Sequence, residues 1–442
     1  MNWNKLLSDK RFGMEQYHEE RKHERTDFQR DYDRLVFSAP FRRLQNKTQV
    51  FPLPGSVFVH NRLTHSLEVA CVGRSLGDKV GRELIVKYGS GNLFLLQIGS
   101  IVSAACLAHD LGNPPFGHSG EKAISNYFSA GKGAVFIEKM KSEGARFSDF
   151  LSFEGNANSL RLLTHQFKGR RPGGFAMTCS TLASIVKYPY ASTLASEKGK
   201  YGFFASEEKG YQQIADELEI IKLQEEPLRF CRHPLVYLVE AADDICYQIM
   251  DIEDAHKLKI ISTQECKDLL MNFFSEEKQD RTKKVMELVS DANEQIAYLR
   301  SSVIGKLVDE CSEVFLDNEP DILQGRFHSP LIKNIREPAL KAYKTCSELA
   351  FRKIYRSQDV LDVELGGYRI INFLLDCLLE AVENPENVYS KLLIGRIPEQ
   401  YKTDSGDTYT RVQSVVDYIS GMTDVYALDL YQKITGMNLP AL

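Results

Sequence analysis

Residues 101–121 read IVSAACLAHDLGNPPFGHSGE and predict a buried helix that ends in two polar residues. Small and apolar side chains fill residues 101–108, which indicates a helix buried on all sides. His109 and Asp110 follow directly, and a Gly- and Pro-rich turn at residues 112–115 then ends the helix. A buried histidine and a buried carboxylate both need polar partners. Because a metal ion would satisfy both, the stretch predicts a helical core with a metal site at its edge.

The rest of the chain shows the same helical character. Apolar residues return every three or four positions, which is the spacing of an amphipathic α-helix. The segments with this spacing are Leu63–Val86, Phe94–Ala108, Glu121–Phe128, Ala157–Gln166, Cys179–Lys187, Leu235–Met250, Thr263–Phe274, Lys283–Cys311 and Ile370–Glu383. Extended segments are expected only near Gln49–Phe51, Val57–Val59 and Tyr201–Phe204. We therefore predict an all-α fold with at most a minor β-hairpin.

Composition narrows the class of protein. The 442 residues are 43% hydrophobic and 26% charged, the balance of a globular protein with a large core. The formal net charge of −5 argues against a general electrostatic attraction to nucleic acid. The apolar stretch Ile98–Ala108 is too short to cross a bilayer, and the first residues lack the apolar run of a signal peptide. We expect a cytoplasmic protein with no membrane partner.

The nine cysteines fit that expectation. Their number is odd and no CxxC pair occurs, so a disulfide framework or a thiolate zinc site is not indicated. Several lie in apolar periodic stretches, among them Cys71, Cys106 and Cys246. Packed free thiols are the expected state.

Breaks in the helical pattern suggest three regions. The sequence PLPGS at residues 52–56 separates an N-terminal arm, 1–55, from a central region, 56–262, that holds the candidate site. A helical C-terminal region, 263–442, is expected to pack with the centre as one unit. The arm is dense in mixed charge and is expected to pack on the core or on a neighbouring subunit. KGRRPGG, residues 168–174, is a basic loop.

Two further residues complete a candidate metal site. His65 lies on an apolar helical pattern, where a lone histidine is more often structural than a ligand. Asp243 belongs to an acidic run on one helical face, which taken alone more often indicates a solvated surface. Together with His109 and Asp110 they offer nitrogen and oxygen donors without a thiolate, a set that suits Mn, Fe, Co, Ni or Mg. Four protein ligands leave positions open for water and a phosphate oxygen.

The four residues resemble the H…HD…D signature of the HD-domain phosphohydrolases. The surrounding sequence motifs are more specific: RRLQNKTQVF, HNRLTHSLEVA, HDLGNPPFGHSGE, FEGNAN, KYPY and EAADDICY. In this order, between about Arg42 and Asp254, they resemble the bacterial deoxyguanosine triphosphate triphosphohydrolase family. They are also similar to the core of the vertebrate deoxynucleotide hydrolase that restricts retroviruses. One departure is Asn158, where the family pattern has glutamine.

The resemblance implies a role for each matched residue. His65, His109, Asp110 and Asp243 would bind one divalent metal ion, with Mn or Mg expected to serve in an assay. His118 and Glu121 would form an acid–base pair, and their i, i+3 spacing favours contact between the carboxylate and the imidazole. The implied substrate-binding residues are Gln49, Arg62, Asn156, Lys187, Tyr188, Tyr247 and Asp251.

Without the resemblance, plainer interpretations compete. Arg62 would form an ordinary salt bridge at the surface, and His118 would cap the start of a helix. Lys187 and Tyr188 would mark a helix end, and Tyr247 would be a core aromatic. Within the resemblance, Tyr247 stacked on the deoxyribose would exclude a ribose 2′-hydroxyl, while Gln49 and Asp251 would bracket the 3′-hydroxyl.

The implied reaction is hydrolysis of deoxynucleoside triphosphates to deoxynucleoside and inorganic triphosphate, with attack of water at the α-phosphorus. Two alternatives stay open. One is another HD phosphohydrolase, acting on nucleoside monophosphates, cyclic nucleotides or guanosine tetraphosphate. The other is a nucleotide- or nucleic-acid-binding regulatory protein. A homo-oligomer, tetramer or hexamer, is expected, and a nucleotide or single-stranded DNA effector is possible. No motif marks the base preference.

Overall fold

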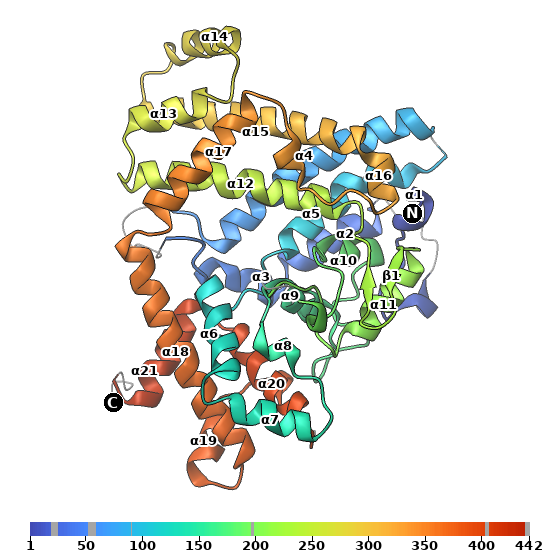
Figure 1. Ribbon diagram of the computed structural model, residues 1–442, viewed down its shortest axis with the longest axis vertical. Helices are drawn as coiled ribbons and strands as arrows, with labels where there is room; N and C mark the ends of the chain where they lie inside the picture. Colours follow the sequence, from blue (N-terminus) through green and yellow to red (C-terminus); the bar gives the residue numbers. More distant parts are fainter. Residues whose placement is uncertain (19–24, 52–58, 90, 196–198, 403–405, 438–442) are drawn as a thin grey trace.

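The computed structural model describes residues 1–18, 25–51, 59–89, 91–195, 199–402 and 406–437. The predicted boundary at 52–56 and most of the expected extended segment at 57–59 lie outside these ranges. Helices dominate the described residues, with one small two-stranded sheet (Figure 1). The prediction of an all-α fold with a minor hairpin is confirmed.

The elements of the first part of the chain run up to the hairpin. They are α1 Trp3–Leu6, α2 Asp27–Val36, α3 Ala39–Arg43, α4 Arg62–Tyr88, α5 Ile98–Ala108, α6 Gly117–Ser129, α7 Ala134–Ser142, α8 Ser148–Leu151, α9 Gly155–Thr164, α10 Cys179–Ile185, α11 Glu208–Glu217, β1 Lys222–Gln224 and β2 Arg229–Phe230. The two strands pair antiparallel, with Lys222 opposite Phe230.

The elements of the second part are all helical. They are α12 Val236–Lys257, α13 Thr263–Met271, α14 Glu276–Met286, α15 Ala292–Asp317, α16 Glu319–Leu323, α17 Ala339–Leu349, α18 Gln358–Glu383, α19 Val388–Arg396, α20 Thr408–Ser420 and α21 Asp424–Thr435. A π-helical turn, Ala350–Ile354, follows α17.

Four long helices form the centre of the molecule. The α4 and α5 helices pack along each other, and α12 and α15 pack against α4 (Figure 1). Residues 98–108 are almost fully buried, as the apolar run predicts. Because α12 lies inside this bundle, its acidic residues Glu240 and Asp251 are buried as well. The interpretation of that face as a solvated surface is therefore wrong.

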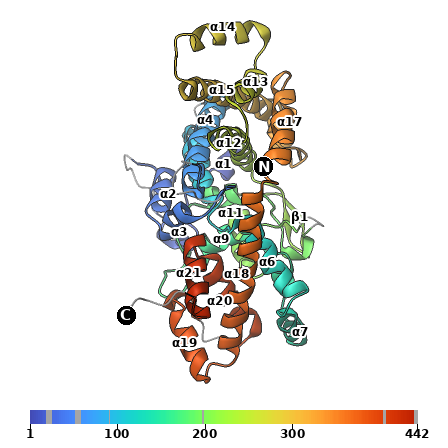
Figure 2. The same cartoon turned by 90° about the vertical axis from the view of Figure 1, so that its left-hand side faces the viewer.

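A second group of helices lies at the other end of the molecule. In Figures 1 and 2, α18 runs alongside α6, and α20 and α21 pack on α18. The C-terminal region therefore contacts the turn and helix that follow His109 and Asp110. Gly367 of α18 marks how close the approach is, since a Cβ there would lie 2.5 Å from the ring of Phe116.

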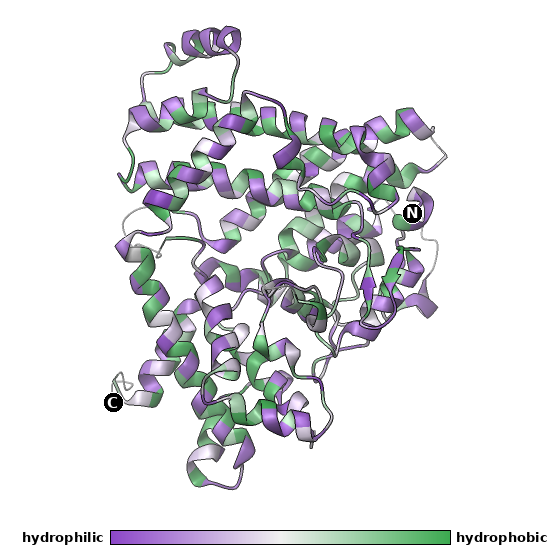
Figure 3. Ribbon diagram, viewed as in Figure 1, coloured by the Kyte–Doolittle hydropathy of each residue, from purple (hydrophilic) through white to green (hydrophobic). Residues whose placement is uncertain are grey.

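Several sequence expectations need correction. The pattern at Lys283–Cys311 is split between α14 and α15, because residues 287–291 leave the helix and the Asp291 side chain caps α15. Residues 49–51 form bends, and Phe203 makes only an isolated bridge with Ala191. In Figure 3, α14 projects from the bundle and is coloured hydrophilic almost throughout, and its only buried residue is Thr282.

The N-terminal segment packs on the same chain. Trp3 Nε1 donates a hydrogen bond to Glu319 Oε1 at 2.7 Å, and the indole ring contacts Phe315. All nine cysteines are free thiols; seven are buried, but Cys71 is exposed, which corrects its expected packing. Among the described residues, no helix combines the length and the apolar character needed to cross a bilayer.

Candidate active site

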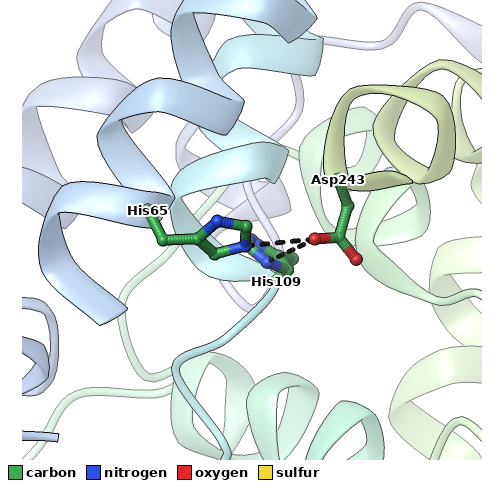
Figure 4. A group of neighbouring side chains, drawn as sticks. All are labelled: His65, His109 and Asp243. Atoms are coloured by element: carbon green, nitrogen blue, oxygen red, sulfur yellow. Dashed lines mark hydrogen bonds and ion pairs between the residues drawn. The ribbon is translucent and has the colours of Figure 1, made fainter. Parts of the chain in front are cut away.

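Three of the four predicted metal ligands meet at one point. His65 comes from α4, His109 directly follows α5, and Asp243 comes from α12 (Figure 4). Asp243 Oδ1 lies 3.1 Å from His65 Nε2 and 3.5 Å from His109 Nε2. One potential ligand atom from each residue lies within 4.8 Å of the other two. The start of α4 is fixed by Asn61 and Thr64, which form a capping box one turn before His65.

The donor atoms of this cluster fit a metal ion. His109 Nδ1 lies 2.6 Å from the carbonyl oxygen of Cys106, so the ring proton belongs on Nδ1. His109 Nε2 is buried and has no hydrogen-bond partner among the described residues. A buried ring nitrogen that faces a carboxylate and a second imidazole, with the other ring nitrogen fixed by the backbone, is the arrangement of a histidine metal ligand.

Asp110 lies beside this cluster. Its Oδ1 is 3.6 Å from His109 Nε2, while its Oδ2 accepts a hydrogen bond from Arg62 Nη1 at 2.8 Å. Burial raises the pKa of Asp110, but Arg62 and the two histidines outweigh that effect and lower it to about 2. Burial likewise lowers the pKa of His109, but Asp110 and Asp243 raise it to about 9. The site is therefore a negative environment that favours a cation.

A cavity of about 300 Å³ opens beside the cluster. It is lined by all the predicted site residues except His65 and Asp251. The lining residues that the sequence did not point to are Asn113, Glu154, Ser184, Ile185, Lys200, Val236, Val239 and Glu240. The motifs of six separate stretches thus converge on one pocket.

The predicted acid–base pair lies at the start of α6. His118 lines the pocket, and its pKa is lowered by desolvation and by the cations of Arg62 and Lys200. Glu121 is buried, which raises its pKa. Glu121 Oε1 accepts a hydrogen bond from the Gly155 backbone N–H at 2.9 Å. No hydrogen bond or ion pair joins these two described side chains, so the expected contact between carboxylate and imidazole is not formed.

Two lysines line the same pocket, and each is paired with a carboxylate. Lys187 Nζ lies 2.9 Å from Glu240 Oε1, and Lys200 Nζ lies 2.6 Å from Glu154 Oε2. Asn156 Nδ2 donates to the same Glu154. Lys200 was missed because no pattern in its stretch distinguishes it from a surface lysine. Both lysines remain charged, since these carboxylates raise their pKa despite burial.

Asp251 is buried behind Tyr247 and is paired with a residue that the sequence did not indicate. Tyr355 donates a hydrogen bond from its hydroxyl to Asp251 Oδ2 at 2.6 Å. The Tyr355 ring stacks on Tyr247, with ring centroids 5.9 Å apart and an interplanar angle of 26°. Tyr355 is 104 residues from Asp251 in the sequence, so only the fold brings them together.

A second cavity, of about 390 Å³, adjoins the first. It shares Gln49, Arg62, His118 and Tyr247 with the first pocket and adds Tyr355 and several residues of α6 and α18. Gln49 Oε1 is buried and has no hydrogen-bond partner among the described residues. The two cavities together form an elongated site with the metal cluster on one side.

The C-terminal region fixes two backbone segments of this site. Asp424, at the start of α21, accepts hydrogen bonds from the backbone N–H groups of Thr48 at 2.8 Å and Phe116 at 2.9 Å. Thr48 precedes Gln49, and Phe116 adopts a left-handed conformation two residues before His118. Lys47 Nζ bridges the carbonyl groups of Asn113 and Ser420.

The helical bundle and the histidine–carboxylate cluster define the class of the protein: it is an HD-domain protein with a candidate metal site. Residues 62–171 match the HD domain, and residues 335–433 match the phosphohydrolase-associated domain.

Comparison of the whole chain narrows the family. The chain is 40% identical to a deoxyguanosinetriphosphate triphosphohydrolase-like protein of Synechocystis, over 99% of this chain and all of the relative. It is 36% identical to a protein of the same name in Pseudomonas aeruginosa, over the full length of both. It is 30% identical to the deoxyguanosinetriphosphate triphosphohydrolase of Yersinia enterocolitica, over 92% of this chain and 93% of the relative. The chain belongs to the deoxyguanosinetriphosphate triphosphohydrolase-like family.

Proposed function

We propose that the chain hydrolyses deoxynucleoside triphosphates to deoxynucleoside and inorganic triphosphate in a metal-dependent reaction. The observation that carries this proposal is the cluster of His65, His109 and Asp243, whose buried His109 Nε2 makes no hydrogen bond among the described residues, at the edge of a pocket that three cationic side chains line. The names of the relatives support the substrate class.

We assign the metal to His65, His109 and Asp243, with Asp110 as the fourth ligand. Nitrogen and carboxylate donors suit Mn²⁺, Mg²⁺, Fe²⁺, Co²⁺ or Ni²⁺, and we expect Mn²⁺ or Mg²⁺ to support turnover. The ion would lower the pKa of water and polarise a phosphate oxygen. To serve as a ligand, Asp110 would share its charge between the ion and Arg62.

The triphosphate is proposed to lie along the wall that carries Arg62, Lys187 and Tyr188. The two cations would neutralise phosphate charge that persists in the transition state. Arg62 lines the pocket and uses one N–H group for Asp110, so its guanidinium group has further N–H donors for a phosphate. Asn156 would add a neutral donor. Lys200 lines the same pocket and joins this set.

His118 is proposed to protonate the 5′-oxygen that leaves the α-phosphorus. Its lowered pKa means that the ring is neutral near pH 7, so it would first take up the proton of the attacking water. Glu121 would act on His118 through the charge of the pocket, since no direct contact joins them. One water molecule thus supplies both the hydroxyl group on phosphorus and the proton on the 5′-oxygen.

The deoxyribose is proposed to lie in the adjoining cavity, on the ring of Tyr247. The side-chain oxygen of Gln49, which has no hydrogen-bond partner among the described residues, would accept a hydrogen bond from the 3′-hydroxyl. Asp251 would reach the sugar only if Tyr355 released it, so we assign Tyr355 and Asp251 jointly to the sugar end. The base would extend toward α18, and no residue pattern there selects guanine.

The assembly is proposed to be a homo-oligomer, tetramer or hexamer, located in the cytoplasm. Exposed apolar side chains on neighbouring helices support self-association: Leu365 of α18 is 70% exposed and Leu392 of α19 is 68% exposed. A nucleotide or single-stranded DNA effector stays a prediction. Light scattering of the purified chain would give the oligomeric state.

A product assay tests the proposed reaction against its alternatives. Each of the four deoxynucleoside triphosphates is incubated with Mn²⁺ or Mg²⁺, alone and in mixtures, and the products are separated by ion chromatography. We expect inorganic triphosphate. Release of phosphate or pyrophosphate would indicate another HD phosphohydrolase. Salt-dependent nucleic-acid binding without turnover would indicate a regulatory protein.

A further inference from the structure

A separate cavity, with four arginines among its ten lining residues, lies beside the N-terminal segment. It has a volume of about 180 Å³ and shares no residue with the two cavities of the active site. Its lining residues are Asp9, Arg11, Met14, Tyr17, His18, Asp27, Arg30, Arg34, Arg171 and Ala176. We call it the arginine pocket. It contains part of the basic loop KGRRPGG, which the proposed reaction does not use.

The pocket is held together by close backbone packing. The Phe12 backbone N–H donates to the Met177 carbonyl oxygen at 3.0 Å, which aligns the N-terminal segment with the chain after the basic loop. Gly13 and Gly173 both have positive φ, 71° and 72°. A Cβ on Gly13 would lie 2.5 Å from Gly173 Cα. The two glycines therefore let the loop approach closely enough to bring Arg171 beside Arg11.

The pocket is lined by four arginines and two carboxylates, Asp27 and Asp9, and Asp9 lies 3.5 Å from His18. Arg11 is neutralised by Asp27 at 2.8 Å and Asp31 at 2.7 Å. Arg34 donates to the Phe175 carbonyl oxygen at 3.0 Å. In the described part of the chain, neither Arg34 nor Arg171 has a carboxylate within ion-pair distance. Arg30 forms an ion pair only with Asp27, at 3.7 Å, and Asp27 already pairs with Arg11.

The surroundings of Arg34 show the same imbalance. Burial lowers its pKa, and the charges of Arg11 and Arg171 lower it further, against smaller opposite effects of Asp31 and Asp27. A guanidinium group that is partly desolvated among other guanidinium groups is stabilised by an added anion.

We propose that the arginine pocket binds a small phosphate or polyphosphate anion between Arg30, Arg34 and Arg171. Guanidinium groups match phosphate oxygens with paired N–H donors, which favours phosphate over a monovalent anion. The cavity is smaller than the roughly 300–1,000 Å³ of sites for drug-sized ligands, so it takes phosphate groups and not a whole nucleoside. The anion is either free or the phosphate tail of a nucleotide whose nucleoside stays outside.

Calorimetric titration with inorganic pyrophosphate, without divalent metal, tests the proposal. The parent variant is the full chain with Arg62→Gln and Lys187→Gln, two changes that weaken anion binding in the active site. Adding Arg34→Gln and Arg171→Gln is expected to weaken the remaining binding at least tenfold. Adding Arg82→Gln instead, an exposed arginine of α4 outside every cavity named here, is expected to change nothing. Because no turnover is measured, the result is independent of the proposed reaction.

Two outcomes would overturn the proposal: no pyrophosphate binding by the parent variant, or equal binding with and without Arg34 and Arg171. Arg34→Lys with Arg171→Lys keeps the charge and is expected to retain weakened binding, which separates loss of the site from loss of the fold. A parallel titration compares inorganic triphosphate with a deoxynucleoside triphosphate. Equal affinity for the two compounds would identify a free anion as the ligand. Tighter binding of the deoxynucleoside triphosphate would identify the phosphate tail of a nucleotide. Both results support the site.

Discussion

At the scale of single residues, the hydrogen bond between His109 Nδ1 and the Cys106 carbonyl oxygen determines what the site can bind. It leaves Nε2 as the ring nitrogen that faces Asp243, 3.5 Å from its Oδ1. The sequence pointed to His109 and Asp110 because an apolar helix ends in a histidine and a carboxylate. Sequence could not predict the tautomer, because the tautomer depends on the distance to a backbone carbonyl.

Replacing Asp243 tests the metal assignment. Asp243→Ala removes the carboxylate that faces both histidines, so we expect kcat/KM to fall by about three orders of magnitude, given a contribution of several kcal/mol. Metal binding, followed by calorimetry, is expected to be lost as well. The control is Asp309→Ala, which removes an exposed carboxylate of α15 that pairs with Lys79. Full metal-stimulated turnover by Asp243→Ala would refute the assignment.

Replacing Tyr247 tests the proposed sugar contact. Tyr247→Ala removes the ring that would lie against the deoxyribose and opens room for a 2′-hydroxyl. We expect the ratio of kcat/KM for deoxyribonucleotide over ribonucleotide to fall about tenfold or more, the range for a steric pocket contact. An unchanged ratio, with both substrates slowed equally, would mean that Tyr247 only packs against Tyr355.

At the scale of elements, long periodic stretches were predicted well and segments without periodicity were not. The helices that carry or directly precede His65, His109 and Asp243 follow the apolar pattern closely. The prediction of one helix over Lys283–Cys311 was wrong. The apolar residues keep nearly the same helical spacing across the five non-helical residues between α14 and α15, so the sequence pattern does not reveal the break. Tyr355 and Lys200 escaped prediction because their roles depend on contacts with distant elements.

The start of α21 offers a test of how the C-terminal region supports the site. Asp424→Ala would leave the Thr48 and Phe116 backbone N–H groups without their acceptor. Each buried unpaired donor costs about 1–3 kcal/mol, so we expect lower stability to denaturant and a lower kcat, since Gln49 and His118 adjoin these groups. Asp429→Ala, which removes only a surface pair with Lys433, is the control. We expect it to change stability by less than about 0.5 kcal/mol. Equal kcat in both variants would contradict a positioning role for Asp424.

At the scale of the whole molecule, His60 joins the chain before α4 to two long helices. Its ring lies 2.8 Å from Asp254 Oδ1 on α12 and 3.0 Å from Glu68 Oε1 on α4. Burial lowers the pKa of His60, but the two carboxylates outweigh it and raise the pKa to about 10. The sequence placed His60 in a family motif but gave no sign of this charged bridge.

The His60 bridge predicts a pH dependence of stability. Because the folded-state pKa lies above the unfolded value, the stabilisation is complete below about pH 6.5 and is lost as pH rises toward 10. We expect the free-energy difference between the wild type and His60→Gln to shrink over this range by a few kcal/mol, at about 1.4 kcal/mol per pKa unit. Denaturant unfolding at a series of pH values measures it. The exposed His328, as His328→Gln, is the control. A pH-independent difference would contradict the bridge.

The central claim is metal-dependent attack of water at the α-phosphorus, and hydrolysis in ¹⁸O-labelled water tests it most directly. A deoxynucleoside triphosphate is hydrolysed in a single-turnover reaction with Mn²⁺, and the masses of both products are measured by mass spectrometry. We predict one ¹⁸O in the inorganic triphosphate and none in the deoxynucleoside. Label in the deoxynucleoside hydroxyl, or release of labelled phosphate or pyrophosphate in place of triphosphate, would contradict the account.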